Sequence, residues 1–241
     1  GFGLAEAATG DTDVVLDDWR LVRNKDGSFT ARAGTAGFAL DLRLNPTQAA
    51  LLQGDRGYSR KGPGQGEASA YFSMPHLAVT GRLTRGAHTE AIRGEAWLDR
   101  EWSSSLLNPR SVGWDWAGLN MDDGSAVTVF RVRDAQGHPV WAGGSVRAAD
   151  GALTILGPGD VAFATRRRWR SPRTGADYPV ETTVSVTTLA GTKRFELRPL
   201  MDDQELDTRR TGGPVYWEGA VEVEGGRGYL ELVGYGGKVS L

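Results

Sequence analysis

The sequence predicts an all-β protein of the sandwich or barrel type. Short segments with alternating apolar and polar residues are separated by turn signals at intervals of roughly 8–12 residues, which is typical of these folds. Glycine supplies 34 of the 241 residues, as expected where tight turns repeatedly need positive φ. Helical character is confined to residues 47–53 and 203–207, and both stretches are too short to form a helical layer.

The N-terminal part predicts a meander of short strands. Residues 1–10 have neither strand alternation nor the character of a leader, so we expect the chain to begin inside a sheet. The expected strands are residues 13–22, 27–34 and 36–46. Turn signals lie at residues 24–27 and 34–37 and at Asn45-Pro46, where the third segment ends.

The glycine-rich stretch Gln53–Gly66 predicts a loop without regular structure. It lacks the residue order of a phosphate-binding loop, which argues against a nucleotide site. Long loops within compact domains are often functional. We therefore predict a lid or rim over a cavity mouth, with a plain surface loop as the alternative, and its polar groups are Asp55, Arg56, Tyr58, Arg60 and Lys61.

The remaining strands include two predicted hairpins, which turn at Asp122-Asp123-Gly124 and at Gly225-Gly226. The expected strands and hairpins are residues 68–75, 77–85, 94–102, 112–133, 160–169, 178–187, 193–200 and 215–237. A weak division near Gly86 predicts two domains, residues 1–86 and 87–241.

Composition and charge narrow the classes of function. A net charge of −2 provides no field to attract nucleic acid or an anionic membrane, so we expect neither partner. The absence of cysteine excludes disulfides, thiolate zinc sites and a cysteine nucleophile. The three histidines are far apart in sequence and show no ligand spacing, and Ser103–Ser105 lack the glycine frame of a nucleophile elbow. We expect no metal and no cofactor.

Residues 94–102, "GEAWLDREW", gather acids and tryptophans on one predicted strand. Alternation places Glu95, Trp97, Asp99 and Glu101 on one side, and the opposite side carries Ala96, Leu98, Arg100 and Trp102. The simplest interpretation leaves the acids in solvent and buries Ala96, Leu98 and Trp102. Asp is depleted in strand interiors, however, and an acid among aromatic side chains would have a raised pKa. Asp99 is therefore our first candidate for a general acid.

The stretch "GWDWAGLNM" places Trp114 and Trp116 on one side of the next strand and Asp115 on the other. If the Asp115 side faces inward, its carboxylate needs a partner such as Arg100 or Arg131. If the tryptophan side faces inward, the indole N–H groups need acceptors. Asp115 is a second catalytic candidate, and a structural Asp–Arg pair is the alternative.

Several stretches together resemble the AttH-like family, which is related to the carotenoid 1,2-hydratases and is often labelled as predicted secreted hydrolases. The resemblance spans residues 14–237 and rests on "LDDWRL", "LQGDRGYSRKG", "GEAWLDREWSSS", "VGWDWAGLNMDDG", "RSPRTGADYP", "RPLMDDQELD", "YWEGAVEV" and "GYLELVGY". It implies two packed lipocalin-like antiparallel β-barrels, the first of them incomplete in this chain. It also implies preceding strands that a separate N-terminal fragment would have to supply, and a periplasmic or secreted protein.

The resemblance also implies a function. Hydratases of the family resemble this chain around "DREW", where Asp99 and Trp102 match while Arg100 and Glu101 occupy the position of the usual histidine. We expect a protein that binds a hydrophobic, isoprenoid or lipid-like ligand and has hydratase-type lyase activity. The tryptophans Trp97, Trp102, Trp114 and Trp116 would line its ligand site. The alternatives are a pericyclase-like enzyme and a non-enzymatic accessory protein that binds membrane components of an ABC-type export system.

Overall fold

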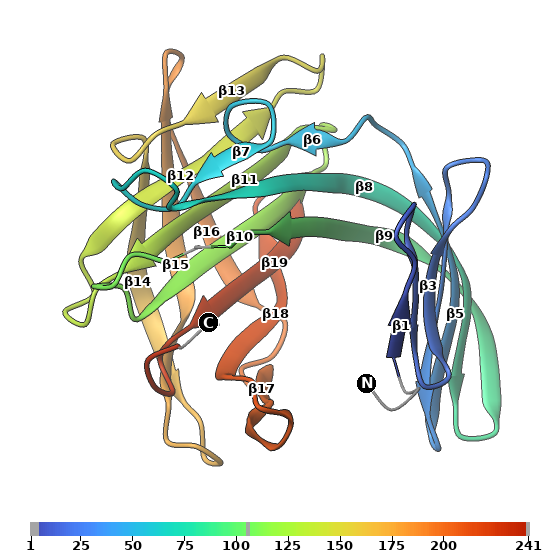
Figure 1. Ribbon diagram of the computed structural model, residues 1–241. Coiled ribbons are helices and arrows are strands. Elements are labelled where there is room, and N and C mark those ends of the chain that lie inside the picture. Colours follow the sequence, from blue (N-terminus) through green and yellow to red (C-terminus); the bar gives the residue numbers. More distant parts are fainter. Residues whose placement is uncertain (1–4, 105–106, 240–241) are drawn as a thin grey trace. The chain divides into compact units, whose positions relative to one another are not determined.

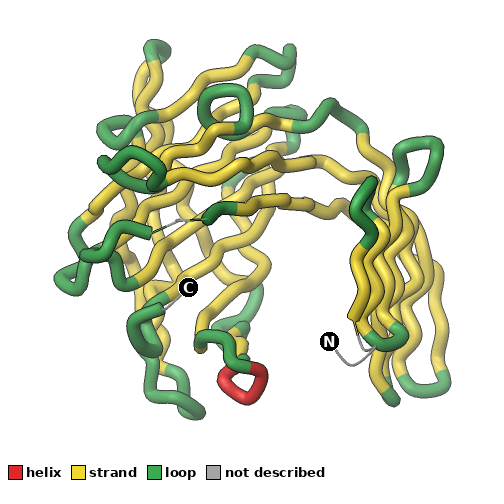
Figure 2. Tube along the Cα trace, viewed as in Figure 1, coloured by secondary structure: helices red, strands yellow, loops and turns green. Residues whose placement is uncertain are grey.

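The computed structural model describes residues 5–104 and 107–239, which form two antiparallel sheets (Figure 1). The prediction of an all-β protein is confirmed: among these residues Figure 2 shows helix only at the 3-10 turn Arg209–Thr211. No helix in this part of the chain combines the length and the apolar character needed to cross a membrane.

The first sheet has the strand order β1-β2-β3-β4-β5-β8-β6, and β7 and β9 also pair with β8. Its strands are β1 (Ala5–Ala7), β2 (Asp13–Leu16), β3 (Trp19–Arg23), β4 (Phe29–Thr35), β5 (Phe38–Pro46), β6 (Leu51–Leu52), β7 (Tyr58–Arg60), β8 (Ala68–Arg85) and β9 (His88–Trp102).

The second sheet has the order β13-β12-β11-β10-β19-β18-β16-β15-β14, and β17 pairs with β18. Its strands are β10 (Gly113–Met121), β11 (Ala126–Arg133), β12 (Pro139–Arg147), β13 (Leu153–Leu156), β14 (Val161–Arg170), β15 (Asp177–Thr188), β16 (Gly191–Pro199), β17 (Glu205–Asp207), β18 (Val215–Val223) and β19 (Gly226–Val233). The end strand β14 contacts β11 and β12, so the sheet curls around its own core without a hydrogen-bonded closure.

The chain divides into two compact units that interleave along the sequence. The first comprises residues 1–50 and 74–98, and the second comprises residues 51–73 and 99–241. The Gly86 turn joins β8 to β9 within the first unit. The assignment of residues 1–86 and 87–241 to two separate domains stays a prediction.

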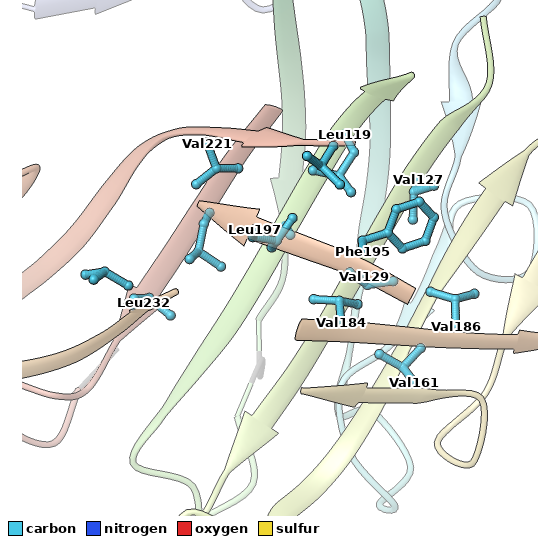
Figure 3. Close-up of a cluster of buried hydrophobic side chains, with 14 of the residues drawn as sticks. Leu119, Val127, Val129, Val161, Val184, Val186, Phe195, Leu197, Val221 and Leu232 are labelled. Carbon is cyan, nitrogen blue, oxygen red and sulfur yellow. The ribbon is translucent and has the colours of Figure 1, made fainter. Parts of the chain in front are cut away.

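The core of the second unit is an apolar layer enclosed by its curled sheet. Strand alternation directs one face of every strand inward, and Figure 3 shows Phe195 of β16 next to Val127 and Val129 of β11. Leu197 and Trp217, from β16 and β18, are almost completely buried in the same cluster. The first unit has a smaller core built on Phe29, Leu44, Leu77 and Val79.

The structure corrects several predicted strand limits. Residues 68–75 and 77–85 form one continuous strand, β8, which passes through His76 at φ 52°. The predicted unstructured stretch Gln53–Gly66 contains β7, because Tyr58–Arg60 pairs with Ala68–Ala70. The helical character at 47–53 and 203–207 is lost to the strands β6 and β17. Within residues 1–10, expected to lack a strand, Ala5–Ala7 pairs with Val14–Leu16; residues 1–4 lie outside the described part.

Strands β12 and β13 were not predicted at all. Their sequence carries Gly143 and Gly144 in the middle of β12, which obscures the alternation. Gly144 adopts φ 152°, and a Cβ there would lie 2.0 Å from the carbonyl oxygen of Thr128. The close approach of β11 therefore demands the glycine that hides the strand in the sequence.

Both predicted hairpins are confirmed. β10 and β11 are joined by a turn in which Gly124 has φ 85°, and β18 and β19 by a turn in which Gly225 has φ 69°. Positive φ is nearly free for glycine and costly for other residues, which explains why these two turns were readable from sequence.

We predict that Leu197→Ala lowers the free energy of unfolding by about 2–5 kcal/mol, because it removes buried methyl groups and leaves a cavity. Leu189→Ala is the matched control, since Leu189 is fully exposed, and it should change stability by less than about 0.5 kcal/mol. Urea unfolding followed by circular dichroism measures both. Equal effects of the two variants would contradict the core described above.

Candidate functional site

The candidate site lies on the face of β10, β19 and β18 that points away from the core. Trp116 of β10 is the direct cross-strand neighbour of Glu231 on β19, and Glu231 is in turn the neighbour of Glu218 on β18. The adjacent residues of β10, Asp115 and Ala117, point to the opposite face. An indole and two carboxyl groups therefore form one row across three strands.

The chain segment 51–73 covers part of this face. The Gln53 amide nitrogen donates to Ser73 at 2.9 Å and to Thr128 of β11 at 2.8 Å, and its oxygen accepts from Ser145 of β12 at 2.6 Å. All four side chains are buried. Both polar atoms of the Gln53 amide are thus hydrogen-bonded, as a buried amide requires. Since the partners lie on β8, β11 and β12, the network holds the segment after β6 and the first half of β8 against β11 and β12.

A hydrogen-bond relay runs from the row to Asp99. The indole N–H of Trp116 donates to the phenolic oxygen of Tyr71 at 2.9 Å, and the Tyr71 hydroxyl donates to Asp99 Oδ2 at 2.7 Å. Tyr71 and Trp116 are buried, whereas Asp99 is exposed. Burial, followed by the charge and hydrogen bond of Asp99, raises the pKa of Tyr71 well above 10. Tyr71 therefore stays a neutral donor to Asp99.

A buried ammonium group lies beside this relay. Lys61 Nζ is 2.7 Å from Glu101 Oε1, 4.0 Å from the ring centre of Phe130 and 4.6 Å from that of Tyr71. Ser69 also donates to Glu101. Burial lowers the pKa of Lys61, while the charges of Glu101 and then Asp99 oppose that shift. Cation–π contacts and the ion pair compensate for the loss of water around the ammonium group.

The two glutamates of the row have raised pKa values. Burial raises the pKa of Glu231 from 4.5 to about 7, against a hydrogen bond from the Trp114 indole N–H at 2.9 Å and with the support of the charges of Glu218, Glu101 and Asp99. Burial and then the charge of Asp99 raise the pKa of Glu218. The row therefore retains a proton near neutral pH.

Asp115 points to the other side of the sheet. It is 1% exposed and accepts from Arg131 at 2.6 Å, from Arg133 at 2.9 Å and from the Tyr235 hydroxyl at 2.9 Å. The two alternatives for "GWDWAGLNM" thus occur together: Asp115 has its arginine partners, and Trp114 and Trp116 have acceptors on the opposite face. The Asp115 cluster is a charge network that holds β10 to β11.

The other predicted site residues are spread out. Trp97 is half-buried in the first unit, and Trp102 is 57% exposed in the second. Asp55, Arg56 and Tyr58 form an exposed turn, in which Asp55 and Arg56 are 3.6 Å apart. The structure therefore groups Asp99 with Trp114 and Trp116. The role of all these residues in binding or catalysis stays a prediction.

The sequence analysis missed most of the polar members of the site. Lys61 was placed on a loop rim and is buried, and Glu101 was placed in solvent and is ion-paired to it. Tyr71, Glu218 and Glu231 were not singled out. The available signal was alternation: Glu218 and Glu231 alternate with the core residues Trp217, Leu230 and Leu232, so they share the face of Trp116.

The arginine-rich stretch 166–173 forms structural ion pairs. Arg167 contacts Glu181 at 2.5 Å and Asp202 at 2.6 Å, and Arg173 contacts Asp203 at 2.6 Å. Across residues 5–104 and 107–239, no group of three or more His, Asp or Glu side chains is arranged to hold a metal ion.

The fold and the site define an all-β protein of lipocalin-like type with a carboxyl-rich aromatic face. The AttH-like family model matches residues 1–235, and the chain belongs to this family. A comparison with curated proteins found no match.

Solved structures support the same fold. A crystal structure described as an AttH protein from Nitrosomonas europaea is 48% identical, covering 98% of this chain and 73% of that one, with a TM-score of 0.90. Kievitone hydratase from Nectria haematococca is 18% identical over 92% of this chain and 70% of that one, with a TM-score of 0.72. CghA is 14% identical over 98% and 74%, with a TM-score of 0.52. The last two show a shared fold.

We predict that Asp115→Asn destabilises the protein by about 3–5 kcal/mol, because Arg131 and Arg133 would keep buried charges without their carboxylate. The control is Asp122→Asn, because Asp122 is exposed and its ion pair with Arg227 is long, at 4.0 Å. Its effect on stability should stay below about 0.5 kcal/mol. Urea unfolding at neutral pH measures both variants. A loss below about 1 kcal/mol for Asp115→Asn would contradict a structural role.

The raised pKa of Glu231 predicts a pH dependence of stability. The folded chain binds this proton more tightly than the unfolded chain, so the stabilisation is complete below pH 4.5 and is lost as the pH rises through about 7. Glu231→Gln should remove this pH-dependent contribution to the free energy of unfolding. The stability of the variant relative to the wild type should therefore be greater at pH 8 than at pH 5. Denaturation at both pH values measures it, with the exposed Glu222→Gln as control. If the stability difference between Glu231→Gln and the wild type is the same at pH 5 and pH 8, the raised pKa of Glu231 is contradicted.

Proposed function

We propose that this AttH-like protein is a hydro-lyase that binds a hydrophobic ligand and adds water to one of its alkene carbons. The observation that carries the proposal is the grouping, on one aromatic face, of the carboxyl group of Glu231, whose pKa is raised to about 7, with that of Asp99. Glu231 is bound by the Trp114 indole, and Asp99 is joined through Tyr71 to Trp116, the cross-strand neighbour of Glu231.

Alkene hydration needs what this face supplies. A carboxylic acid protonates one alkene carbon, a carbocation forms at the other, and a carboxylate accepts a proton from the water that adds to it. The indole faces of Trp114 and Trp116 are suited to stabilise the cation, by ~2 kcal/mol or more where water is excluded. The surrounding carboxylates favour the same positive charge.

The comparisons support this reading. Kievitone hydratase, which by its name adds water to kievitone, shares the fold, as does CghA. The resemblance of the whole chain to the family supports an isoprenoid-like ligand and a location outside the cytoplasm, and both belong to the proposal. The site uses Arg100 and Glu101 where the resembling hydratases tend to have a histidine, so Tyr71 and Asp99 would take over the proton relay.

The direct test is incubation of the purified protein with kievitone and with an acyclic carotenoid in water labelled with oxygen-18. Mass spectrometry should detect a product that has gained one labelled water. Binding of either compound without any product would contradict the hydro-lyase proposal and favour a carrier. Neither binding nor turnover would favour the accessory role beside an export system.

We predict that Asp99→Asn lowers turnover of the hydrated compound by about 10²–10⁴-fold, because a neutral amide cannot exchange protons with water at this position. Ligand affinity should stay within about threefold, since the amide keeps the size of the carboxylate and can accept from Tyr71. Asp122→Asn is the matched control outside the site. Equal turnover in Asp99→Asn and the wild type would contradict the role of Asp99.

A further inference from the structure

We propose that Glu231, with Glu218 as its carboxyl neighbour, is the proton donor of this site and that Asp99 is its base. This inference rests on the proposed hydration and names the residues for its two proton transfers. It differs from the sequence-based expectation, in which Asp99 was the acid.

Neither Glu218 nor Glu231 has a cation beside it within the described residues. Glu218 and Glu231 are direct cross-strand neighbours on β18 and β19, and like charges at such positions destabilise a sheet. Within the described residues, no Lys, Arg or His side chain lies within ion-pair distance of either. Glu101, by contrast, is paired with Lys61. A proton on Glu231 removes the repulsion between its carboxyl group and that of Glu218.

One carboxyl oxygen of Glu231 is left open by its hydrogen bonding. The Trp114 N–H donates to Oε2, and over the described chain Oε1 accepts no hydrogen bond. A proton on Oε1 would therefore remain available to a ligand on the aromatic face. Trp114 and Trp116 both lie on this face, because they are two residues apart on β10 and the intervening Asp115 points to the opposite face. A cation formed by protonation would therefore arise next to two indoles.

Glu231 lies in an electrostatic environment with an excess of carboxyl groups. The charged or titratable groups that interact with Glu231 are Glu218 and Tyr216 on β18, Asp99 and Glu101 on β9, and Lys61; Tyr71 and Tyr229 interact with these carboxyl groups in turn. The tyrosines are neutral, so four carboxyl groups face one ammonium. Burial and this excess of negative charge hold the pKa of Glu231 at about 7, where a general acid is most effective at neutral pH.

Asp99 has the complementary surroundings of a base. Tyr71 donates its hydroxyl to Asp99 and keeps its own proton because its pKa is raised well above 10. The ammonium of Lys61 also acts favourably on the Asp99 carboxylate. Asp99 thus has a hydrogen-bond donor and a nearby ammonium group, which is the setting that an accepting carboxylate needs.

Hydration then requires two proton transfers and one C–O bond. The alkene π pair takes the Glu231 proton, so a C–H bond forms and an O–H bond of Glu231 breaks. The oxygen of a water molecule then bonds to the cationic carbon, and one of its protons passes to Asp99. Proton return from Asp99 to Glu231 through solvent restores both groups, and the sum is alkene plus water giving an alcohol.

The first experiment follows the indole N–H of Trp114 by NMR of protein labelled with nitrogen-15 in tryptophan, assigned with Trp114→Phe. The N–H should titrate with a midpoint near pH 7 in the wild type and at lower pH in Asp99→Asn, which removes a charge that raises the pKa of Glu231, and it should not titrate in Glu231→Gln. Glu218→Gln should move the midpoint to lower pH, whereas Glu222→Gln on the same strand should not. A midpoint below about pH 5, or titration that persists in Glu231→Gln, would overturn the proposal.

The second experiment measures turnover against pH with whichever of kievitone and the acyclic carotenoid is hydrated. The loss of rate above neutral pH should move to lower pH in Glu218→Gln, and Glu231→Gln should lose at least about 10²-fold in kcat at every pH. A Glu231→Gln enzyme with the wild-type pH profile would overturn the donor role. If neither compound is hydrated, the hydro-lyase proposal fails, while the NMR titration still decides whether Glu231 holds the proton.

Discussion

Protein packs against both faces of the second sheet at β10, and the packing of the neighbouring strands depends on this constraint. On one face, Ala117, Leu230 and Trp217 enter the core. On the other, residues 51–73 cover the sheet and are anchored through Gln53. Strand alternation then forces polar and aromatic side chains of these strands into a partly dehydrated layer, where their charges and hydrogen bonds must be satisfied by each other.

The two carboxylate clusters at β10 and its neighbours differ in how their negative charge is compensated. Asp115 is paired with Arg131 and Arg133 and accepts a hydrogen bond from Tyr235. On the opposite face, the described residues place one ammonium, Lys61, near four carboxyl groups, those of Asp99, Glu101, Glu218 and Glu231. This excess of carboxyl groups is unfavourable for stability, and it contributes to the raised pKa of Glu231.

The family relationship and the site carry different kinds of information. The match over residues 1–235 and the 48% identity to the Nitrosomonas europaea protein establish the fold and the family. The more distant hydratase shares the fold at 18% identity, which does not by itself transfer a reaction. The proposed chemistry therefore depends on the Trp116–Tyr71–Asp99 relay and on Glu231.

The sequence by itself determined the all-β class, the hairpins at Gly124 and Gly225, the sharing of one face by Trp114 and Trp116, and the choice of Asp99, because alternation and turn chemistry are local properties. Only the tertiary structure decided which face of β10 is covered by which segment. It placed Lys61 in the interior, Tyr71 between Trp116 and Asp99, and Glu231 beside Trp114. The separations along the chain are 45 residues for Trp116 and Tyr71 and 117 for Trp114 and Glu231, and no local pattern encodes such pairings.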